Sequence, residues 1–160
     1  MGIDFERRCW AEINLDNLRH NFGLIQKVAG SARVMAVVKA NAYGHGDLVA
    51  ARALADAGAR SFAVSGLSEA VRLRRSGLKG PILVLGYTSP QHTARLRVHN
   101  LTQCIFSAEY ARQLSDAAVA AGVRVRVHLK VDTGMGRLGF NAKDDPAGTV
   151  AALAEAYGLP

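Results

Sequence analysis

The alternation of short apolar runs with helical patterns limits what this chain can fold into more than any other feature of its sequence. The runs recur about every twenty residues and cover residues 34–38, 62–64, 81–85, 103–106 and 123–132. A helical pattern at 15–28 precedes them, and helical patterns or helix-start signals follow them, at 47–57, 68–76, 89 onward, 107–122 and 145–157. Such alternation is typical of an α/β fold with parallel strands.

The number of these units leaves two architectures open. A closed (β/α)8 barrel needs eight strands and around 250 residues, whereas this sequence has 160 residues and five βα units. The pattern therefore fits either an open five-stranded sheet or the first five units of a barrel. No linker or low-complexity segment interrupts residues 1–160, so we expect a single domain without an internal boundary.

Composition excludes several classes of protein. Hydrophobic residues make up 49% and charged residues 21%, as in ordinary globular domains, and no apolar run approaches the roughly 20 residues of a membrane helix. Residues 1–8 contain no apolar segment of a secretory leader. The net charge of +7 comes from scattered arginines without a basic tail or stacking aromatics, so no nucleic-acid partner is expected.

The cysteines and histidines are too dispersed for a metal centre. Cys9 and Cys104 lie far apart, which favours free thiols in a reducing compartment, and we expect a cytoplasmic protein. No cluster of His, Cys and carboxylate residues has metal-ligand spacing. His45 lies in a glycine loop and His128 on a polar strand face, where turn structure or packing explains each as well as catalysis does.

A lysine ends the first apolar run, in the sequence A-V-V-K-A-N-A-Y-G-H-G over residues 36–46. A lysine at the mouth of a buried strand is costly to desolvate, which favours a neutral, nucleophilic amine able to form a Schiff base with a carbonyl compound. The glycines after Lys39 allow a sharp turn and a close approach to a ligand. Most strand-end lysines simply extend into solvent, but eleven consecutive residues resemble the pyridoxal-phosphate lysine motif of the alanine racemase family.

The fifth apolar run carries a second motif. Apolar and charged residues alternate over 123–132, and because helices cover the outside of a βα sheet, we expect the charged face to point inward. The stretch H-L-K-V-D-T-G-M-G-R-L-G over 128–139 resembles the second signature of the same family, and A-E-I-N-L-D-N-L over 11–18 resembles its usual opening. Residues 134–139 also have the G-x-G-x-x-G spacing of dinucleotide-binding loops, but this is a weak indication, since no helix pattern opens at Gly139.

The resemblance implies a partial (β/α)8 TIM-type barrel and a pyridoxal-phosphate-dependent isomerase that interconverts L- and D-alanine for cell-wall precursors. It implies that Lys39 holds the cofactor and acts as a base, that Tyr43 contacts the phosphate, and that Leu85 lies beside the cofactor ring. It also implies that Lys130 is carbamylated and holds Arg137, whose guanidinium would face the cofactor's phenolic oxygen and the substrate carboxylate. Members of the family act as homodimers.

Several parts of the family pattern do not occur in this sequence. The remaining barrel strands, the main phosphate loop and the C-terminal β domain with its second catalytic tyrosine are absent, so we expect this chain alone to be inactive. Serine remains an alternative substrate, since L-G-Y-T-S-P over 85–90 looks closer to the serine/alanine racemases of vancomycin resistance. A non-catalytic pyridoxal-phosphate-binding protein remains a second alternative.

Overall fold

A parallel sheet of five strands forms the centre of the molecule in the computed structural model, which describes residues 9–160. The expectation about a leader in residues 1–8 lies outside this range. The strands stand in the sheet in their order along the chain, as β1 (Met35–Val37), β2 (Ser61–Val64), β3 (Ile82–Val84), β4 (Thr102–Ile105) and β5 (Arg126–Leu129). All four pairings are parallel, which confirms the predicted α/β fold.

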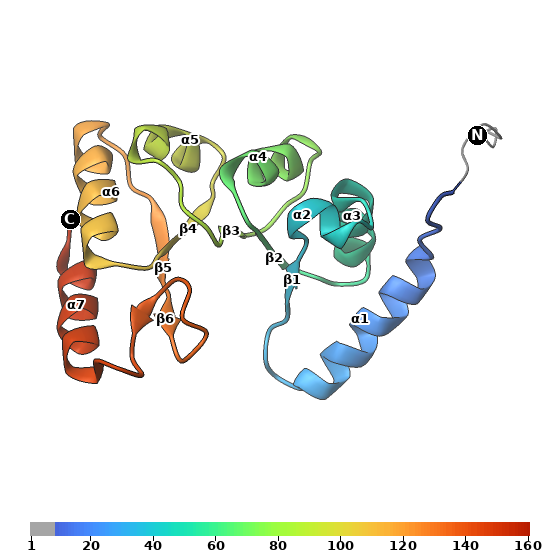
Figure 1. Ribbon diagram of the computed structural model, residues 1–160. Helices are drawn as coiled ribbons and strands as arrows, with labels where there is room; N and C mark the ends of the chain where they lie inside the picture. The colour runs from blue at the N-terminus through green and yellow to red at the C-terminus, as the bar shows by residue number, and fades with distance from the viewer. Residues whose placement is uncertain (1–8) are drawn as a thin grey trace.

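Helices cover one face of this sheet. Figure 1 shows the strands as an arc with helices along its outer side. In chain order the helical elements are α1 (Leu15–Ala29), α2 (Lys39–Tyr43), α3 (Asp47–Asp56), α4 (Leu67–Arg75), the 3-10 turn η1 (Pro90–His92), α5 (Thr93–Val98), α6 (Ala108–Ala120) and α7 (Pro146–Gly158). None of the helices within residues 9–160 has the length and apolar character needed to cross a membrane.

The two faces of the sheet are chemically different. The main core lies on the outer face, where strand residues such as Phe62, Ile82 and Ile105 pack against helix residues including Leu73 and Leu114. The inner face carries a smaller apolar cluster of Ala63, Leu83 and Cys104, with Met35 and Leu85 packed against it. A sheet with helices on one side and a concave inner face matches the expectation of a partial barrel.

The fifth strand departs from its predicted extent of 123–132. β5 ends at Leu129, and Val131–Asp132 forms β6, which pairs in parallel with β7 (Phe140–Asn141) in a separate two-stranded sheet. The Lys130 carbonyl accepts the N–H of Phe140 (2.8 Å), so the chain leaves the main sheet at this residue. Alternation alone could not show that break, because both strands keep the same side-chain period.

The predicted inward direction of the charged face is supported by the strand register. Arg126 lies beside Thr102 and His128 beside Cys104, which belongs to the inner cluster. On the other face of β5, Val125 and Leu129 pack against the main core. Val127 remains 44% exposed, so the helices do not fully cover this strand.

Candidate functional site

The carboxyl ends of the strands bring three of the predicted site residues to one edge of the sheet. Leu85 and Lys130 come directly after the ends of β3 and β5, and Lys39 comes two residues after the end of β1. The backbone of this edge stays hydrogen-bonded, since the N–H of Leu85 donates to Val64 (2.9 Å) and that of Lys130 to Ile105 (2.8 Å). In parallel α/β sheets this edge is where catalytic residues gather.

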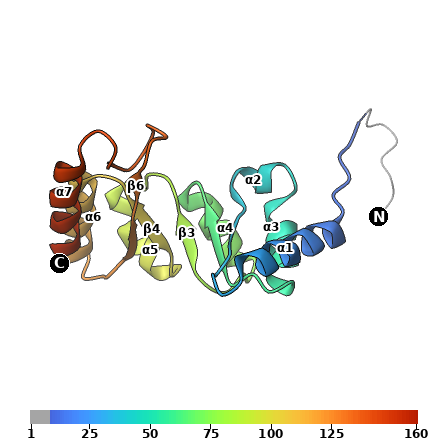
Figure 2. The same cartoon turned by 90° about the horizontal axis from the view of Figure 1, so that it is seen from below.

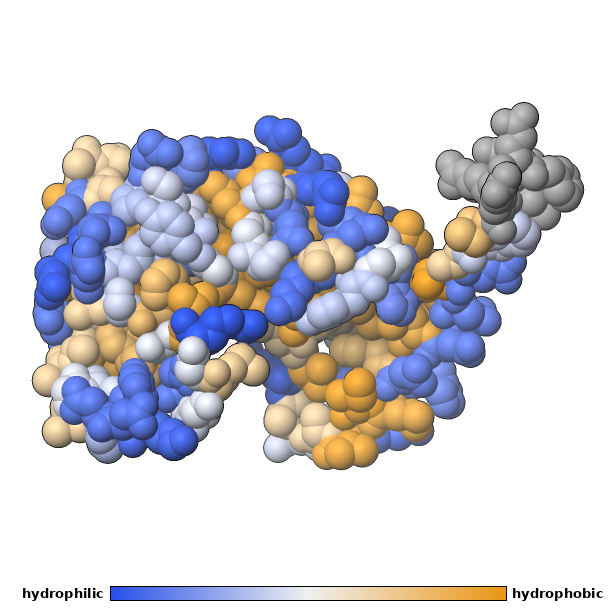
Figure 3. Space-filling model, viewed as in Figure 1, coloured by the Kyte–Doolittle hydropathy of each residue, from blue (hydrophilic) through white to orange (hydrophobic). Residues whose placement is uncertain are grey.

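Alternation along the strands assigns Leu85 and Lys130 to the inner face. Leu85 follows the inner residue Leu83 by two positions, and Lys130 follows His128 by two. Figure 2 shows α2 and the loop after β6 projecting from the same edge of the sheet, and Figure 3 shows the molecule hollowed on the side between α1 and the β6 region.

Lys39 and Tyr43 lie close together at the first of these positions. The Lys39 ammonium nitrogen is 5.9 Å from the centre of the Tyr43 ring, within range of a cation–π interaction. Lys39 is half-buried, and Tyr43 is 61% exposed. The fold therefore places an amine and a phenol side by side just beyond the carboxyl end of β1.

The turn that connects them is left-handed. Ala40, Asn41 and Ala42 have φ values of 50°, 55° and 52°, and Tyr43 has a φ of 55°. For L-amino acids this conformation costs roughly 1–2 kcal/mol per residue and is usually seen at isolated positions. Four consecutive residues in it, none of them glycine, store backbone strain beside Lys39, and such strain is typical of functional sites.

Hydrogen bonds within the segment hold the end of this turn. The Asn41 side chain accepts the N–H of Asp47 (3.0 Å), and the Asn41 carbonyl accepts the N–H of Gly46 (2.9 Å). His45 Nδ1 donates to the carbonyl of Ala42 (2.8 Å), which gives this histidine a structural role in the turn. Gly44 and Gly46 adopt positive φ values, which are consistent with the sharp turn expected at the glycines of this motif.

Helix α4 contacts the turn through two side chains that the sequence analysis missed. Glu69 accepts the N–H of Ala40 (2.7 Å), the residue directly after Lys39. Arg72 forms an ion pair with the buried carboxylate of Asp47 (2.5 Å). The only sequence signal for Glu69 is its place three residues after a helix start, where an acidic side chain caps the helix.

The electrostatics of Glu69 follow from its many donors. Burial alone would raise the pKa of this carboxyl, but hydrogen bonds from the Ser65 hydroxyl and from the N–H groups of Ala40, Ser65 and Gly66 lower it overall. Because each bond favours the ionised form, Glu69 acts as a fixed anion between two loops.

The loop that carries Arg137 is organised by Asp132. The carboxylate of Asp132 accepts the N–H of Gly134 (2.9 Å) and of Arg137 (3.0 Å). Backbone donors of the loop, that of Gly134 first, lower the pKa of Asp132. The Arg137 side chain is exposed, and within residues 9–160 it makes no hydrogen bond or ion pair. Its predicted contact with a carbamylated Lys130 stays a prediction.

Lys130 and His128 lie on the inner face near Cys104. Burial raises the pKa of the Cys104 thiol, and the positive charge of Lys130 partly offsets this. His128 is exposed and stands beside Cys104 in the register. No group of three or more His, Cys, Asp or Glu side chains comes together in the described part of the chain.

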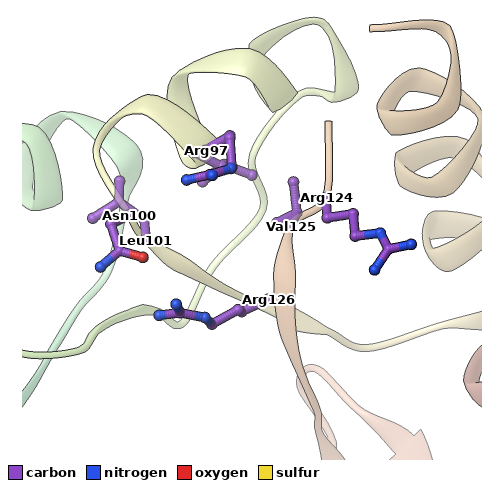
Figure 4. A pocket seen from close by; sticks show the side chains of 7 residues that line it. Arg97, Asn100, Leu101, Arg124, Val125 and Arg126 are labelled. Carbon is purple, nitrogen blue, oxygen red and sulfur yellow. The ribbon is translucent and has the colours of Figure 1, made fainter. Parts of the chain in front are cut away.

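The larger hollows lie away from this edge. A groove of about 1000 Å³ runs between β5, α6 and the end of α7, and a pocket of about 430 Å³ lies at the amino ends of β4 and β5. In the pocket, Arg97 and Arg126 extend to one side and Arg124 to the other (Figure 4), so the three guanidinium groups do not converge. Neither hollow is lined by Lys39, Tyr43 or Arg137.

Comparison with known proteins gives a consistent result. Residues 13–159 match the model of the family described as "Alanine racemase, N-terminal domain". The chain is 48% identical over 151 residues to an alanine racemase of Desulforamulus reducens, covering 94% of this chain and 41% of that protein. The chain thus spans about two fifths of the length of such curated relatives.

Solved structures agree with the sequence comparison. An alanine racemase of Clostridium difficile 630, in complex with cycloserine, superposes with a TM-score of 0.85 at 35% identity, covering 94% of this chain and 41% of that one. A histidine racemase from Leuconostoc mesenteroides subsp. sake superposes with a TM-score of 0.81 at 33% identity, over 91% of this chain and 38% of that one.

Proposed function

The chain belongs to the alanine racemase family, and from this premise we propose that it is part of a pyridoxal-phosphate-dependent enzyme that interconverts L- and D-alanine for cell-wall precursors. The observation that carries the proposal is Lys39, held at the carboxyl end of β1 by a strained left-handed turn and 5.9 Å from the Tyr43 ring. Because the chain spans about two fifths of its relatives, the activity is proposed for the whole protein.

The side chains at this edge have the chemistry that pyridoxal phosphate requires. Lys39 supplies a primary amine for the aldehyde, and Tyr43 supplies a phenolic hydroxyl for the phosphate. Leu85 supplies an apolar contact for the ring, and Arg137 a planar fork for the phenolic oxygen and a substrate carboxylate. The cofactor, when bound, withdraws electrons from the substrate's Cα and so acidifies its proton.

Lys39, Arg137 and Lys130 each have a defined part in the proposed reaction. Lys39 Nζ takes up or returns the Cα proton on one face of the substrate. Arg137 fixes the substrate carboxylate, and we propose that carbamylation turns Lys130 into an anion that holds Arg137 in position. Inversion also needs a base on the opposite face, which we assign to a tyrosine of a second domain in the partner subunit of a homodimer.

The first test is covalent labelling of Lys39. The chain is incubated with pyridoxal phosphate and reduced with borohydride, and the labelled peptides are mapped by mass. We expect the label on Lys39 in the unchanged chain and in Lys79→Arg, an exposed control, and its loss in Lys39→Arg. Labelling spread evenly over the surface lysines would contradict the assignment of Lys39.

The second test measures racemisation directly. The full-length protein is expected to convert L-alanine to D-alanine, and the 160-residue chain is expected not to. The likeness to a histidine racemase shows that this part of the fold accompanies more than one substrate, so L-serine and L-histidine belong in the same assay. A full-length protein that binds the cofactor but racemises no amino acid would favour the non-catalytic alternative.

The cysteines support the expected location. Cys9 is an exposed free thiol and Cys104 a buried one. Free thiols persist in reducing compartments, and we therefore keep the cytoplasm as the proposed location of the protein.

A further inference from the structure

The carboxylate of Glu69 joins two loops at the carboxyl edge of the sheet. Its Oε1 accepts the N–H of Ala40 (2.7 Å), in the turn after β1. Its Oε2 accepts the N–H (2.7 Å) and hydroxyl (2.6 Å) of Ser65 and the N–H of Gly66 (3.2 Å), in the loop after β2. The two oxygens of one side chain therefore serve two different segments.

The turn at residues 40–43 depends on contacts from outside itself. The left-handed conformation is unfavourable for Ala40, Ala42 and Tyr43, so the isolated segment would relax to other backbone conformations. Inside the segment, the N–H of Ala42 bonds to the carbonyl of Val38 (3.1 Å), but the N–H of Ala40 is bonded to Glu69. Glu69 thus restrains the residue at which the left-handed run begins.

Helix α4 holds both ends of the segment. One turn after Glu69, Arg72 pairs with Asp47, the first residue of α3. The segment from Lys39 to Asp47 is therefore fixed at its start by Glu69 and at its end by Arg72. Both holding side chains are on the same rigid element, which keeps the distance between the two contacts constant.

We propose that Glu69 is a positioning residue that fixes the left-handed turn after Lys39 and so aims the Lys39 amine into the inner face of the sheet. This inference rests on the proposed function only for what Lys39 binds. The restraint of Ala40 by Glu69 stands on the hydrogen bonds alone. Glu69 does not contact the reacting atoms, and its effect passes through the backbone of Ala40.

The variant Glu69→Gln distinguishes the proposed positioning of the turn from a role of Glu69 that is limited to capping α4. The capping contacts use Oε2, which accepts three donors, so the single amide oxygen of glutamine is best placed there. The amide NH₂ then faces the N–H of Ala40, donor against donor. Glu69→Gln therefore retains the cap and loses the contact with the turn, whereas Glu69→Ala loses both.

The first measurement is amide hydrogen exchange in the chain without cofactor. We expect the Ala40 amide to exchange about tenfold faster in Glu69→Gln, since one charge-assisted hydrogen bond is lost. The Gly66 amide should stay protected in that variant and lose protection in Glu69→Ala. Glu109→Gln, the same change in the first turn of α6, should alter neither. Unchanged exchange of Ala40 in Glu69→Gln would overturn the inference.

The second measurement is the rate of pyridoxal-phosphate labelling at Lys39, with borohydride trapping. In Glu69→Gln we expect about tenfold slower labelling at Lys39 and an unchanged rate at the exposed Lys79. Fast Ala40 exchange with undiminished Lys39 labelling would overturn the claim that the turn aims the amine. If the unchanged full-length protein protects Ala40 but does not label Lys39, the proposed function fails while the restraint by Glu69 stands.

Discussion

At the scale of single residues, Tyr110 shows how one buried hydroxyl fixes a loop. It accepts the N–H of Thr88 (3.2 Å) and donates to the carbonyl of the same residue (2.8 Å), while its ring stacks on Phe106. Burial is the main cause that raises the pKa of Tyr110 to about 12. The hydroxyl thus satisfies both backbone groups of Thr88 in the loop after β3.

Replacing Tyr110 by Phe should lower the free energy of unfolding by about 1–3 kcal/mol, because both Thr88 groups lose their partner. The stabilisation by Tyr110 should be complete below pH 10 and be lost as the pH rises toward about 12, since only the unfolded state ionises there. Urea unfolding of the unchanged chain and of Tyr110→Phe, from below pH 10 to about pH 12, measures this difference in the free energy of unfolding. Tyr157→Phe, at a position 86% exposed, is the control. Equal stability of Tyr110→Phe and the control would contradict the prediction.

The lowered pKa of Asp132 leads to a second prediction at this scale. In Asp132→Asn the amide of Arg137 should exchange faster at neutral pH, because an asparagine side chain has one acceptor oxygen for the donors of the loop. Because the pKa of Asp132 is lowered in the folded chain, its carboxylate stabilises the folded loop at pH values above the pKa that Asp132 has in the unfolded chain. This stabilisation is lost as the pH falls through the pKa of the folded chain. Exchange in the two chains should therefore converge in acid, and a constant difference would argue against this role.

At the scale of elements, the helix ends were largely predictable because their capping residues are local signals. Ser107 and Asp145 cap α6 and α7 as expected. The helix expected at 68–76 begins one residue earlier, as α4, after Gly66 and with Glu69 as the capping side chain. The left-handed turn was not predictable, since alanine and tyrosine carry no preference for it and tertiary contacts impose it.

The edge of the sheet that carries the candidate site was predictable, but the contacts that hold the turn after Lys39 were not. Lys39 follows the first apolar run, Leu85 ends the third and Lys130 lies near the end of the fifth, so the sequence indicated their edge of the sheet. Glu69 lies 29 positions beyond its partner Ala40, and no local pattern reports such a contact.

The link between β6 and β7 allows a prediction for a matched pair of glycines. A Cβ at Gly139 would lie 2.6 Å from the backbone nitrogen of Asp132, whereas one at Gly136 would meet nothing within 4 Å. Both have positive φ, so Gly136→Ala should cost about 1 kcal/mol, and Gly139→Ala should also open the β6–β7 pair. Trypsin cleavage after Arg137 should accelerate more in Gly139→Ala, and equal rates would contradict the steric argument.

At the scale of the whole molecule, the arc of strands has two outer edges. β1 and β5 each have one neighbour in the sheet, and β5 is largely exposed. An uncovered parallel strand offers free backbone donors and acceptors to another chain. The 160-residue chain should therefore self-associate as its concentration rises.

A lysine on β5 should reduce this association, since charged side chains protect strand edges. Val127→Lys, at a position 44% exposed, should remain monomeric to higher concentration than the unchanged chain in sedimentation velocity. Val98→Lys, the same change at a site 77% exposed on α5, should have no such effect. An equal shift in both variants would indicate a general effect of charge and not of the strand edge.

The identity of spatial and chain order in the sheet has a consequence for biosynthesis. Each of the strands β2 to β5 pairs with the strand made just before it. A nascent chain leaving the ribosome can therefore add one βα unit at a time to the part already folded. During translation of these five strands, one unpaired edge belongs to the most recently synthesised strand, which the next unit covers within seconds, and the other is the outer edge of β1.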